Sequence, residues 1–260
     1  PGDNATTSMV AAGKADFGVS YQEDVTYALT SEDPLPIKTI ATIIQHNTSG
    51  FVSLKSANIN SVKDFEGKTY AGWGAPSEEA VIKAVMNEAG ADFSQLNIVG
   101  SDGSGIAGLS DEVGKNKVNL GWEFYGWAII KALQDGYDLN YMPLADLDSR
   151  LDYYTPVIIT NNKMIEKNSD TVKKFMEATK KGYEYAIDHP SKAAEILHDD
   201  ALTDTDLKFL KESQKYLSGQ YAKDADSWGV MKDSVWDNYT DFMYETGLID
   251  HKIDAKDQYT

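Results

Sequence analysis

The stretch Gly13-Lys-Ala-Asp-Phe-Gly-Val-Ser-Tyr-Gln-Glu-Asp24 decides the fold that we predict for this chain. An apolar face over residues 7–11 predicts a helix, and Gly13 is placed to end it. Residues 17–19, Phe-Gly-Val, form a strand that is too short and too apolar to be exposed on both faces. Residues 20–23 then follow the carboxyl end of the strand, where open α/β sheets place ligand-binding loops. An ordinary surface loop would have the same composition, so the rest of the chain has to decide between the two.

The remainder of the sequence repeats the alternation of strand and helix. The apolar patterns predict strands over residues 37–45, 68–72, 96–99, 118–122, 139–144 and 155–160. Helices are predicted over residues 77–90, 123–136, 169–187, 190–198, 204–217 and 232–246. This order predicts an α/β fold with parallel sheets covered by helices.

Composition limits the class of protein. The chain has 260 residues, with 42% hydrophobic and 25% charged residues, so it can form one large soluble domain or two lobes. Its net charge of −17 argues against binding to nucleic acid or to an anionic membrane surface, because both depend on Lys and Arg. Solubility is the simplest reason for the acidity. No apolar run approaches the roughly 20 residues that span a bilayer.

Signatures of enzymes and of metal sites are missing. The sequence has no cysteine, which excludes disulfides, zinc–thiolate sites, iron–sulfur clusters and cysteine nucleophiles and is compatible with export. His46, His189, His198 and His251 are far apart and lack the spacing of metal ligands. The chain also lacks a G-x-S-x-G elbow, a Walker loop, an H-E-x-x-H motif and an EF-hand loop. We therefore predict no cofactor and no catalytic residue.

One glycine pattern invites a nucleotide interpretation. Gly103, Gly105 and Gly108 follow a predicted strand and match G-x-G-x-x-G. However, the helix-like segment after them is short, and no ordinary Rossmann unit surrounds the match. A flexible loop before a short helix explains the pattern better than a dinucleotide site.

The charges and rings that remain suggest the kind of ligand. Arg150 is the only arginine, and arginine forks are favoured for carboxylates, sulfonates and phosphates, so the balance favours a neutral or cationic ligand. A helix N-terminus, such as the one at Ser77, could still hold an anion. Aromatic residues cluster at predicted strand ends and can stack on a flat ring, an interaction worth roughly 0.5–1.5 kcal/mol beyond area burial: Tyr21, Trp73, Trp122, Phe124, Tyr125, Tyr153 and Tyr154.

Glu123 directly follows Trp122. A buried carboxylate there could accept hydrogen bonds from an exocyclic amine, and from a ring nitrogen when that nitrogen is protonated. Those needs match a 4-aminopyrimidine. In the alternative interpretation, Trp122 and Trp127 pack in the core, and Glu123 is a solvated residue in the first turn of a helix, where the helix dipole favours it.

Four segments together resemble a known family: the opening stretch of residues 13–24 and the segments over residues 41–51, 62–70 and 74–79. They resemble the solute-binding proteins of ABC importers, and more narrowly the NMT1/THI5-like group that binds thiamine pyrimidine precursors. The step V-K-D-F-E-G-K in residues 62–68 is common to many type II binding proteins, so it supports the fold more than the ligand. The resemblance covers most of residues 1–160.

The resemblance implies a type II periplasmic-binding-protein fold with two lobes, a hinge and an interlobe cleft. Lobe one would comprise residues 1–52 and 156–260, and lobe two residues 56–148, with crossovers near residues 52–56 and 146–156. Similar proteins carry an earlier strand and helix of lobe one, which are apparently missing here. Because the chain begins at Pro1 without Met, processing or trimming is expected.

The resemblance also implies a function. The chain would be the extracytoplasmic component of an ABC importer, in the periplasm or as a lipoprotein on the outer face of the membrane. It would bind a hydroxymethyl- or formylaminomethyl-aminopyrimidine and deliver it to a membrane permease, as a monomer, without nucleic acid and without chemistry on the ligand. His46 joins the candidate contacts because its polar loop lies at a strand end near the crossover. The predicted ligand-binding residues are Tyr21, Gln22, Glu23, His46, Asn47, Trp73, Pro76, Ser77, Trp122, Glu123 and Tyr125.

Other functions stay open. Within the same class, the ligand could be another flat ring such as riboflavin, or a sulfonate held by helix termini. An enzyme of the pyrimidine-synthase type belongs to a different class, and the missing cysteines oppose it because those enzymes resemble one another in a cysteine-rich iron motif. An adaptor protein explains poorly why so many polar and aromatic turns gather at strand ends.

Overall fold

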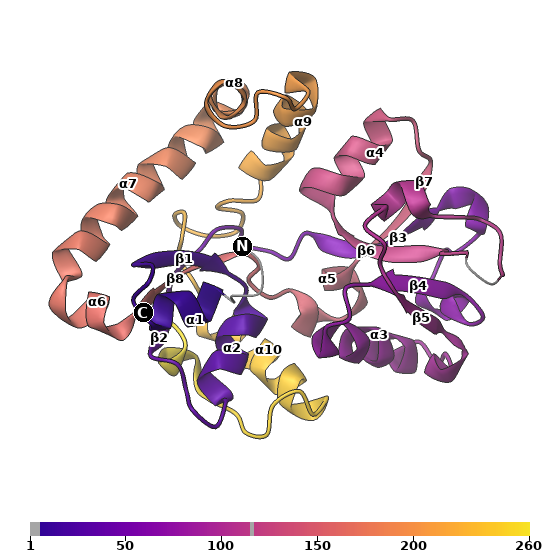
Figure 1. Cartoon of the computed structure of the whole chain (residues 1–260), viewed down its shortest axis with the longest axis horizontal. Helices are drawn as coiled ribbons and strands as arrows, with labels where there is room; N and C mark the ends of the chain where they lie inside the picture. Colours follow the sequence, from indigo (N-terminus) through magenta and orange to yellow (C-terminus); the bar gives the residue numbers. More distant parts are fainter. Residues whose placement is uncertain (1–5, 115–116) are drawn as a thin grey trace. The chain divides into compact units, whose positions relative to one another are not determined.

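The computed structural model describes residues 6–114 and 117–260 and divides the chain into two compact units (Figure 1). Unit 1 comprises Pro1–Asn47 and Asp152–Thr260, and unit 2 comprises Thr48–Leu151. Each unit contains a sheet covered by helices, so both belong to the α/β class that the sequence predicts. Within the described residues, no helix is long and apolar enough to cross a membrane.

Unit 1 is built on a three-stranded sheet in the order β1-β8-β2. The strands are β1 (Phe17–Ser20), β2 (Ile37–Thr42) and β8 (Val157–Asn161), and β8 is antiparallel to both neighbours. The helices of this unit are α1 (Thr6–Ala11), α2 (Gln22–Thr30), α6 (Asn162–Lys167), α7 (Ser169–Asp188), α8 (Pro190–Asp200), α9 (Leu207–Ser218) and α10 (Asp233–Glu245).

Unit 2 is built on a five-stranded sheet in the order β5-β4-β6-β3-β7. Its strands are β3 (Ser49–Leu54), β4 (Thr69–Gly72), β5 (Asn97–Gly100), β6 (Leu120–Phe124) and β7 (Leu139–Pro143). Strand β4 runs parallel to β5 and β6, whereas β3 is antiparallel to β6 and β7. The helices are α3 (Pro76–Glu88), α4 (Ile130–Gln134) and α5 (Leu144–Leu147), with a 3-10 turn at Gly105–Gly108 and a π-helix at Tyr125–Ile129.

The prediction of purely parallel sheets is wrong for β3 and β8. Each is the first strand after the chain passes from one unit to the other, and each has a neighbouring strand on both sides in its sheet. All of β8 and nearly all of β3 is buried. Burial on both faces is the pattern expected of a parallel strand, so the reversed direction left no mark in the sequence. Strand β3 also occupies residues for which the sequence predicted the first crossover, and the chain changes unit earlier, between Asn47 and Thr48.

The opening stretch folds as predicted at its start and differs afterwards. Helix α1 ends before Gly13, whose φ of +68° is the left-handed conformation that glycine adopts easily. Strand β1 follows, but it is an edge strand, and Val19 is 55% exposed rather than buried. The expected loop over residues 20–24 is short, because α2 already begins at Gln22.

A second difference bears directly on the site. The sequence predicted a helix from Glu123, but β6 continues through Phe124 and the helical segment begins with the π-helix at Tyr125. Glu123 is therefore a strand residue, paired with Gly50 of β3. π-helical turns are rare and often occur at functional sites.

Aromatic packing holds this strand against the core of unit 2. Phe51 is fully buried in β3 and makes edge-to-face contacts with Phe65, Tyr70 and Trp122, with ring centroids 5.3, 6.2 and 5.7 Å away. Such pairs add to the stability that comes from the buried area. The indole of Trp122 is thereby packed against the core on the side of Phe51.

Candidate functional site

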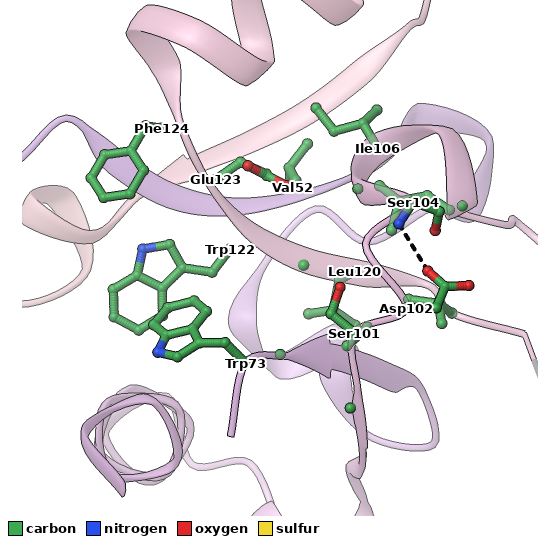
Figure 2. Close-up of a pocket in the computed structure, with 18 residues that line it drawn as sticks. Val52, Trp73, Ser101, Asp102, Ser104, Ile106, Leu120, Trp122, Glu123 and Phe124 are labelled. Atoms are coloured by element: carbon green, nitrogen blue, oxygen red, sulfur yellow. Dashed lines mark hydrogen bonds between the residues drawn. The ribbon is translucent and has the colours of Figure 1, made fainter. Parts of the chain in front are cut away.

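A pocket of about 380 Å³ lies in unit 2, where β4 and β5 end and along β6. The carboxyl ends of neighbouring parallel strands meet at one edge of a sheet, which is where open α/β sheets bind ligands. The volume falls in the range of about 300–1,000 Å³ that is typical of small-molecule sites. Figure 2 shows two indoles side by side at one end, the loop of Ser101, Asp102 and Ser104 at the other, and Glu123 between them.

Two tryptophans form the aromatic end of the pocket. The rings of Trp73 and Trp122 lie 5.2 Å apart with an angle of 62° between their planes. Trp73 is 59% exposed, although it is one of the largest apolar side chains of the chain. An exposed tryptophan beside a second indole offers a π-face to a planar ligand, which binds best by offset or edge-to-face contact.

Glu123 supplies a carboxylate to the same pocket. Burial raises its pKa above the ordinary value of a glutamate. Among the described residues, no hydrogen-bond donor meets this carboxylate, and its Oε1 lies beside Gly105, where an added Cβ would be 3.6 Å away. The acceptor capacity of Glu123 is therefore available to a ligand.

The loop opposite the indoles brings polar groups that the sequence had not placed in the site. The amide of Ser104 donates to Oδ1 of Asp102 at 2.9 Å, and the amide of Gly103 donates to Oγ of Ser101 at 3.1 Å. Hydrogen bonds from Ser104 lower the pKa of Asp102. The glycine pattern was the available signal for this loop: Gly103 and Gly105 have φ values of +83° and +54°, which let the chain turn here.

The lining is acidic. It contains the carboxylates of Asp102 and Glu123, and no Lys, Arg or His is found among the described residues that line it. Arg150, the single arginine, donates from Nε and Nη2 to the carboxylate of Asp148, at 3.0 and 2.6 Å from Oδ2. The pocket therefore offers hydrogen-bond acceptors and negative charge rather than a cationic clamp.

The predicted residues of unit 2 fall into two sets. Trp73, Trp122 and Glu123 come together in the pocket. Pro76 and Ser77 lie in the first turn of α3, and Tyr125 begins the π-helix, with its ring 5.3 Å from that of Tyr141. These last three residues do not line the pocket.

The start of α3 differs from its prediction. The helix begins with Pro76, one residue before the predicted start at Ser77, and has Ala75 at its N-cap without a side-chain cap. Proline suits the first helical position because its missing N–H would have no partner there.

In unit 1, the three predicted residues after β1 have different environments. Tyr21 is 44% exposed at the N-cap of α2. Gln22 is fully buried; its Oε1 accepts from the amide of Tyr154 at 2.8 Å, and its Nε2 donates to the carbonyl of Val235 at 3.3 Å. The side chain of Gln22 therefore connects α2 to Tyr154 and to α10 within unit 1. Glu23 has a buried Oε2 without a partner, and burial raises its pKa to about 8.

His46 and Asn47 are engaged by carboxylates of their own unit. Nδ1 of His46 lies 2.6 Å from Oδ2 of Asp152, and its Nε2 lies 3.3 Å from Oδ2 of Asp224. The amide of Asn47 donates to Oδ1 of Asp152 at 2.8 Å. Asp152 thus connects the end of the first segment of unit 1, at His46 and Asn47, with the start of its second segment.

Metal ligation has no support in the described part of the chain. No group of three or more His, Cys, Asp or Glu side chains is arranged there to hold an ion.

Comparison with known proteins identifies the family. The model of the family described as NMT1/THI5 like matches residues 1–193. A formylaminopyrimidine-binding protein of Halalkalibacterium halodurans is 26% identical over 235 residues, which are 85% of this chain and 68% of that protein. The riboflavin-binding protein RibY of Chloroflexus aurantiacus is 23% identical over 251 residues, 89% of this chain and 66% of that one. The chain thus spans about two thirds of the length of both relatives.

Solved structures show the fold. The alkanesulfonate-binding protein SsuA of Xanthomonas axonopodis pv. citri, bound to MOPS, has a TM-score of 0.70 at 11% identity and covers 97% of this chain and 83% of its own. The desulfurization enzyme DSZB, in complex with biphenyl-2-sulfinic acid, has a TM-score of 0.66 at 9% identity and covers 97% and 85%. Binding proteins and an enzyme therefore share this architecture. The chain has the fold of periplasmic binding proteins and belongs to the NMT1/THI5-like family.

Proposed function

We propose that this protein is the solute-binding component of an ABC importer and that its ligand is a thiamine pyrimidine precursor, a hydroxymethyl- or formylaminomethyl-aminopyrimidine. The observation that carries the proposal is the pocket of unit 2, in which Trp73, Trp122 and the unpartnered carboxylate of Glu123 meet. The family and the formylaminopyrimidine-binding relative support the same ligand class.

The chemistry of a 4-aminopyrimidine suits this pocket. Its flat ring can lie against the exposed indole of Trp73, and its exocyclic amine can donate to Glu123. A hydrogen bond to a charged group contributes about 1.5–3 kcal/mol, which is the size of effect that a substitution of Glu123 would reveal. Ser101 and Ser104 add hydroxyls that can bind the substituent at the other end of the ligand.

A sulfonate fits the pocket poorly. Binding a permanently anionic group calls for Lys, Arg or a helix N-terminus, and the lining presents the carboxylates of Asp102 and Glu123 instead. The likeness to the alkanesulfonate-binding protein, at 11% identity, is a likeness of fold and carries no argument about the ligand.

Riboflavin is the second candidate within the same class. It is supported by the relative RibY and by the paired indoles, which would accept any flat ring. The formylaminopyrimidine-binding relative is the more similar of the two, at 26% against 23% identity, and Glu123 offers an acceptor to an exocyclic amine that riboflavin lacks, so we rank the pyrimidine first.

The remaining parts of the proposal follow from this role. We propose that the ligand leaves unchanged; the lack of cysteine opposes the chemistry of pyrimidine synthases. The protein acts outside the cytoplasm, free or as a lipoprotein, and passes the ligand to a membrane permease as a monomer. Of the residues predicted in unit 1, Tyr21 and Glu23 remain proposed contacts.

Calorimetric titration tests the proposal. The panel comprises 4-amino-5-hydroxymethyl-2-methylpyrimidine, its formylaminomethyl analogue, riboflavin and taurine. Glu123→Gln keeps the size of the side chain and removes its charge, and Glu79→Gln is the matched control because Glu79 is exposed in α3. We expect one of the aminopyrimidines to bind, with an affinity about tenfold or more lower in Glu123→Gln and unchanged in the control.

Two results would overturn parts of this account. Binding of taurine without binding of either pyrimidine would reject the ligand class. Equal affinity of the wild type and Glu123→Gln for the pyrimidine would keep the ligand and reject the role of Glu123.

A further inference from the structure

Glu78 is a buried residue beside the pocket, and its carboxylate accepts hydrogen bonds from the turn between β4 and α3 and from Tyr70. It is 2% exposed and lies in the first turn of α3. The hydroxyl of Tyr70 and the amide of Trp73, the latter at 3.3 Å, both donate to its Oε1. The amide of Gly74 donates to its Oε2 at 2.9 Å. Among the described residues, no basic side chain pairs with it, so these three donors at the N-terminus of α3 are its partners.

The preceding strand is shaped to receive this carboxylate. A Cβ added at Gly72 would lie 2.1 Å from Oε1 of Glu78 and 2.4 Å from its Cδ. Contacts that short do not occur, so an alanine at position 72 would force the carboxylate of Glu78 to move. Gly74 has a φ of +80°, which completes the tight turn between β4 and α3.

The turn held in this way carries Trp73. The backbone amide of Trp73 is one of the groups that Glu78 binds, and its indole is otherwise 59% exposed. The ring faces Trp122 at 5.2 Å, so the position of the turn sets the distance between the two indoles (Figure 2). An exposed side chain with few contacts of its own depends on its backbone for a fixed position.

We propose that Glu78 is a positioning residue of the ligand pocket, which fixes the Trp73 turn and thereby the spacing of the two indoles without touching the ligand. The inference rests on the proposed function, because it assigns Glu78 to the same site. It extends the site to two residues that do not line the pocket, Tyr70 and Glu78.

The first test uses two substitutions that differ by one position. Glu78→Gln keeps the volume but places an amide NH₂ against either the Trp73 and Tyr70 donors or the Gly74 donor, so one donor must lose its partner. Glu79→Gln changes the charge of the same helical turn at an exposed position. We expect affinity for the formylaminomethyl pyrimidine to fall about tenfold in Glu78→Gln and to stay unchanged in Glu79→Gln.

A double-mutant cycle separates positioning from a purely structural role. If Glu78 acts through Trp73, then Glu78→Gln lowers affinity in the wild type and has no further effect in a Trp73→Ala background. A structural role would lower affinity by the same factor in both backgrounds, and that result would overturn the proposal.

Near-ultraviolet circular dichroism of the ligand-free protein gives a second readout. Two indoles at 5.2 Å give a signal that depends on their mutual geometry. We expect Glu78→Gln to change this signal in the same direction as Trp73→Phe, and Glu79→Gln to leave it unchanged. Gly72→Ala, which forces the carboxylate aside without removing it, should give the same change if Glu78→Gln proves too unstable to purify.

The two proposals fail separately. Absence of binding by the wild type would reject the ligand, while the dichroism still tests whether Glu78 sets the indole pair. An unchanged signal in both Glu78→Gln and Gly72→Ala would reject the positioning role even if the pyrimidine binds.

Discussion

Glu23 of unit 1 and Glu78 of unit 2 occupy matching places and have opposite environments. Each lies in the first turn of a helix that follows a short strand, β1 before α2 and β4 before α3. Each is preceded by an exposed aromatic residue at the end of the strand, Tyr21 at 44% and Trp73 at 59% exposure. From the sequence alone the two segments are alike.

The difference lies in the donors that meet each carboxylate. Glu78 accepts from the Tyr70 hydroxyl and from two backbone amides. Glu23 is met by its own amide and by the Tyr153 hydroxyl, while its buried Oε2 has no partner. Tyr153 is itself stacked on Tyr239, with ring centroids 4.0 Å apart. Burial consequently raises the pKa of Glu23 to about 8, in spite of these two bonds.

The comparison shows that the number of donors, more than burial, decides what a buried carboxylate can do. A carboxylate with all its acceptors used becomes part of the scaffold. One with a spare oxygen is ready to bind a proton or a ligand donor. Glu123 in the pocket belongs to the second kind, because burial raises its pKa and no donor meets it among the described residues.

The largest expected effect is the pH dependence of stability that comes from Glu23. Its pKa is higher in the folded than in the unfolded state, so the folded state binds the proton more tightly. The resulting stabilisation is complete below the unfolded pKa of 4.5 and is lost as the pH rises through about 8. A shift from 4.5 to about 8 corresponds to at most about 5 kcal/mol, at about 1.36 kcal/mol per unit.

We therefore expect Glu23→Gln to raise the free energy of unfolding relative to the wild type at pH 9 and to change it little at pH 4. Urea denaturation over this pH range measures the difference. Glu32→Gln, at an exposed position, is the control and should follow the wild type. Parallel curves for Glu23→Gln and the wild type would show that Glu23 has an ordinary pKa.

Removal of the Glu78 carboxylate should lower the free energy of unfolding, whereas removal of the Glu23 carboxylate should raise it. Glu78→Ala leaves the Tyr70 hydroxyl and the amides of Trp73 and Gly74 without their acceptor. Each unsatisfied buried donor costs about 1–3 kcal/mol, so a loss of about 3 kcal/mol is expected once water reaches the exposed turn. Urea denaturation at pH 7 and pH 9 should show the loss at both values. A variant as stable as Glu79→Ala would contradict the comparison.

The smallest effect concerns binding at Glu123. Protonation removes an acceptor from the pocket, so pyrimidine affinity should fall as the pH drops through the raised pKa of Glu123, above the ordinary glutamate value of about 4.3. Titrations of the wild type and Glu123→Gln between pH 4 and pH 8 test this. The variant shares the ionisation of the ligand, so the difference between the two curves isolates Glu123. A constant ratio of affinities would rule out a titrating contact.

The sequence was sufficient for the class of fold, whereas contact of Trp73, Trp122 and Glu123 with a ligand stays a prediction. Apolar patterns and glycines located most strands and helices, and the strand-end positions of Trp73 and Trp122 predicted their meeting in one pocket. The family followed from short motifs, which the match over residues 1–193 confirmed.

Other features depend on contacts between distant residues and left no local pattern. The reversed strands β3 and β8 are the first strands after the two passages between units, and their apolar composition would suit either direction. Glu123 lies on strand β6, and the helical segment begins only with the π-helix at Tyr125, whereas the sequence predicted a helix from Glu123. The network of Glu78 joins a strand, a turn and a helix, and the pairing of a glycine with a carboxylate six residues later has no signature in one sequence.

A crystal structure of the protein with the bound formylaminomethyl pyrimidine tests the central claim most directly. The account predicts the pyrimidine ring against Trp73 or Trp122, at the centroid separations of about 4.5–7 Å that aromatic pairs adopt. It also predicts the exocyclic amine within about 3.2 Å of the Glu123 carboxylate. A ligand bound away from both indoles, with Glu123 facing no donor, would contradict it.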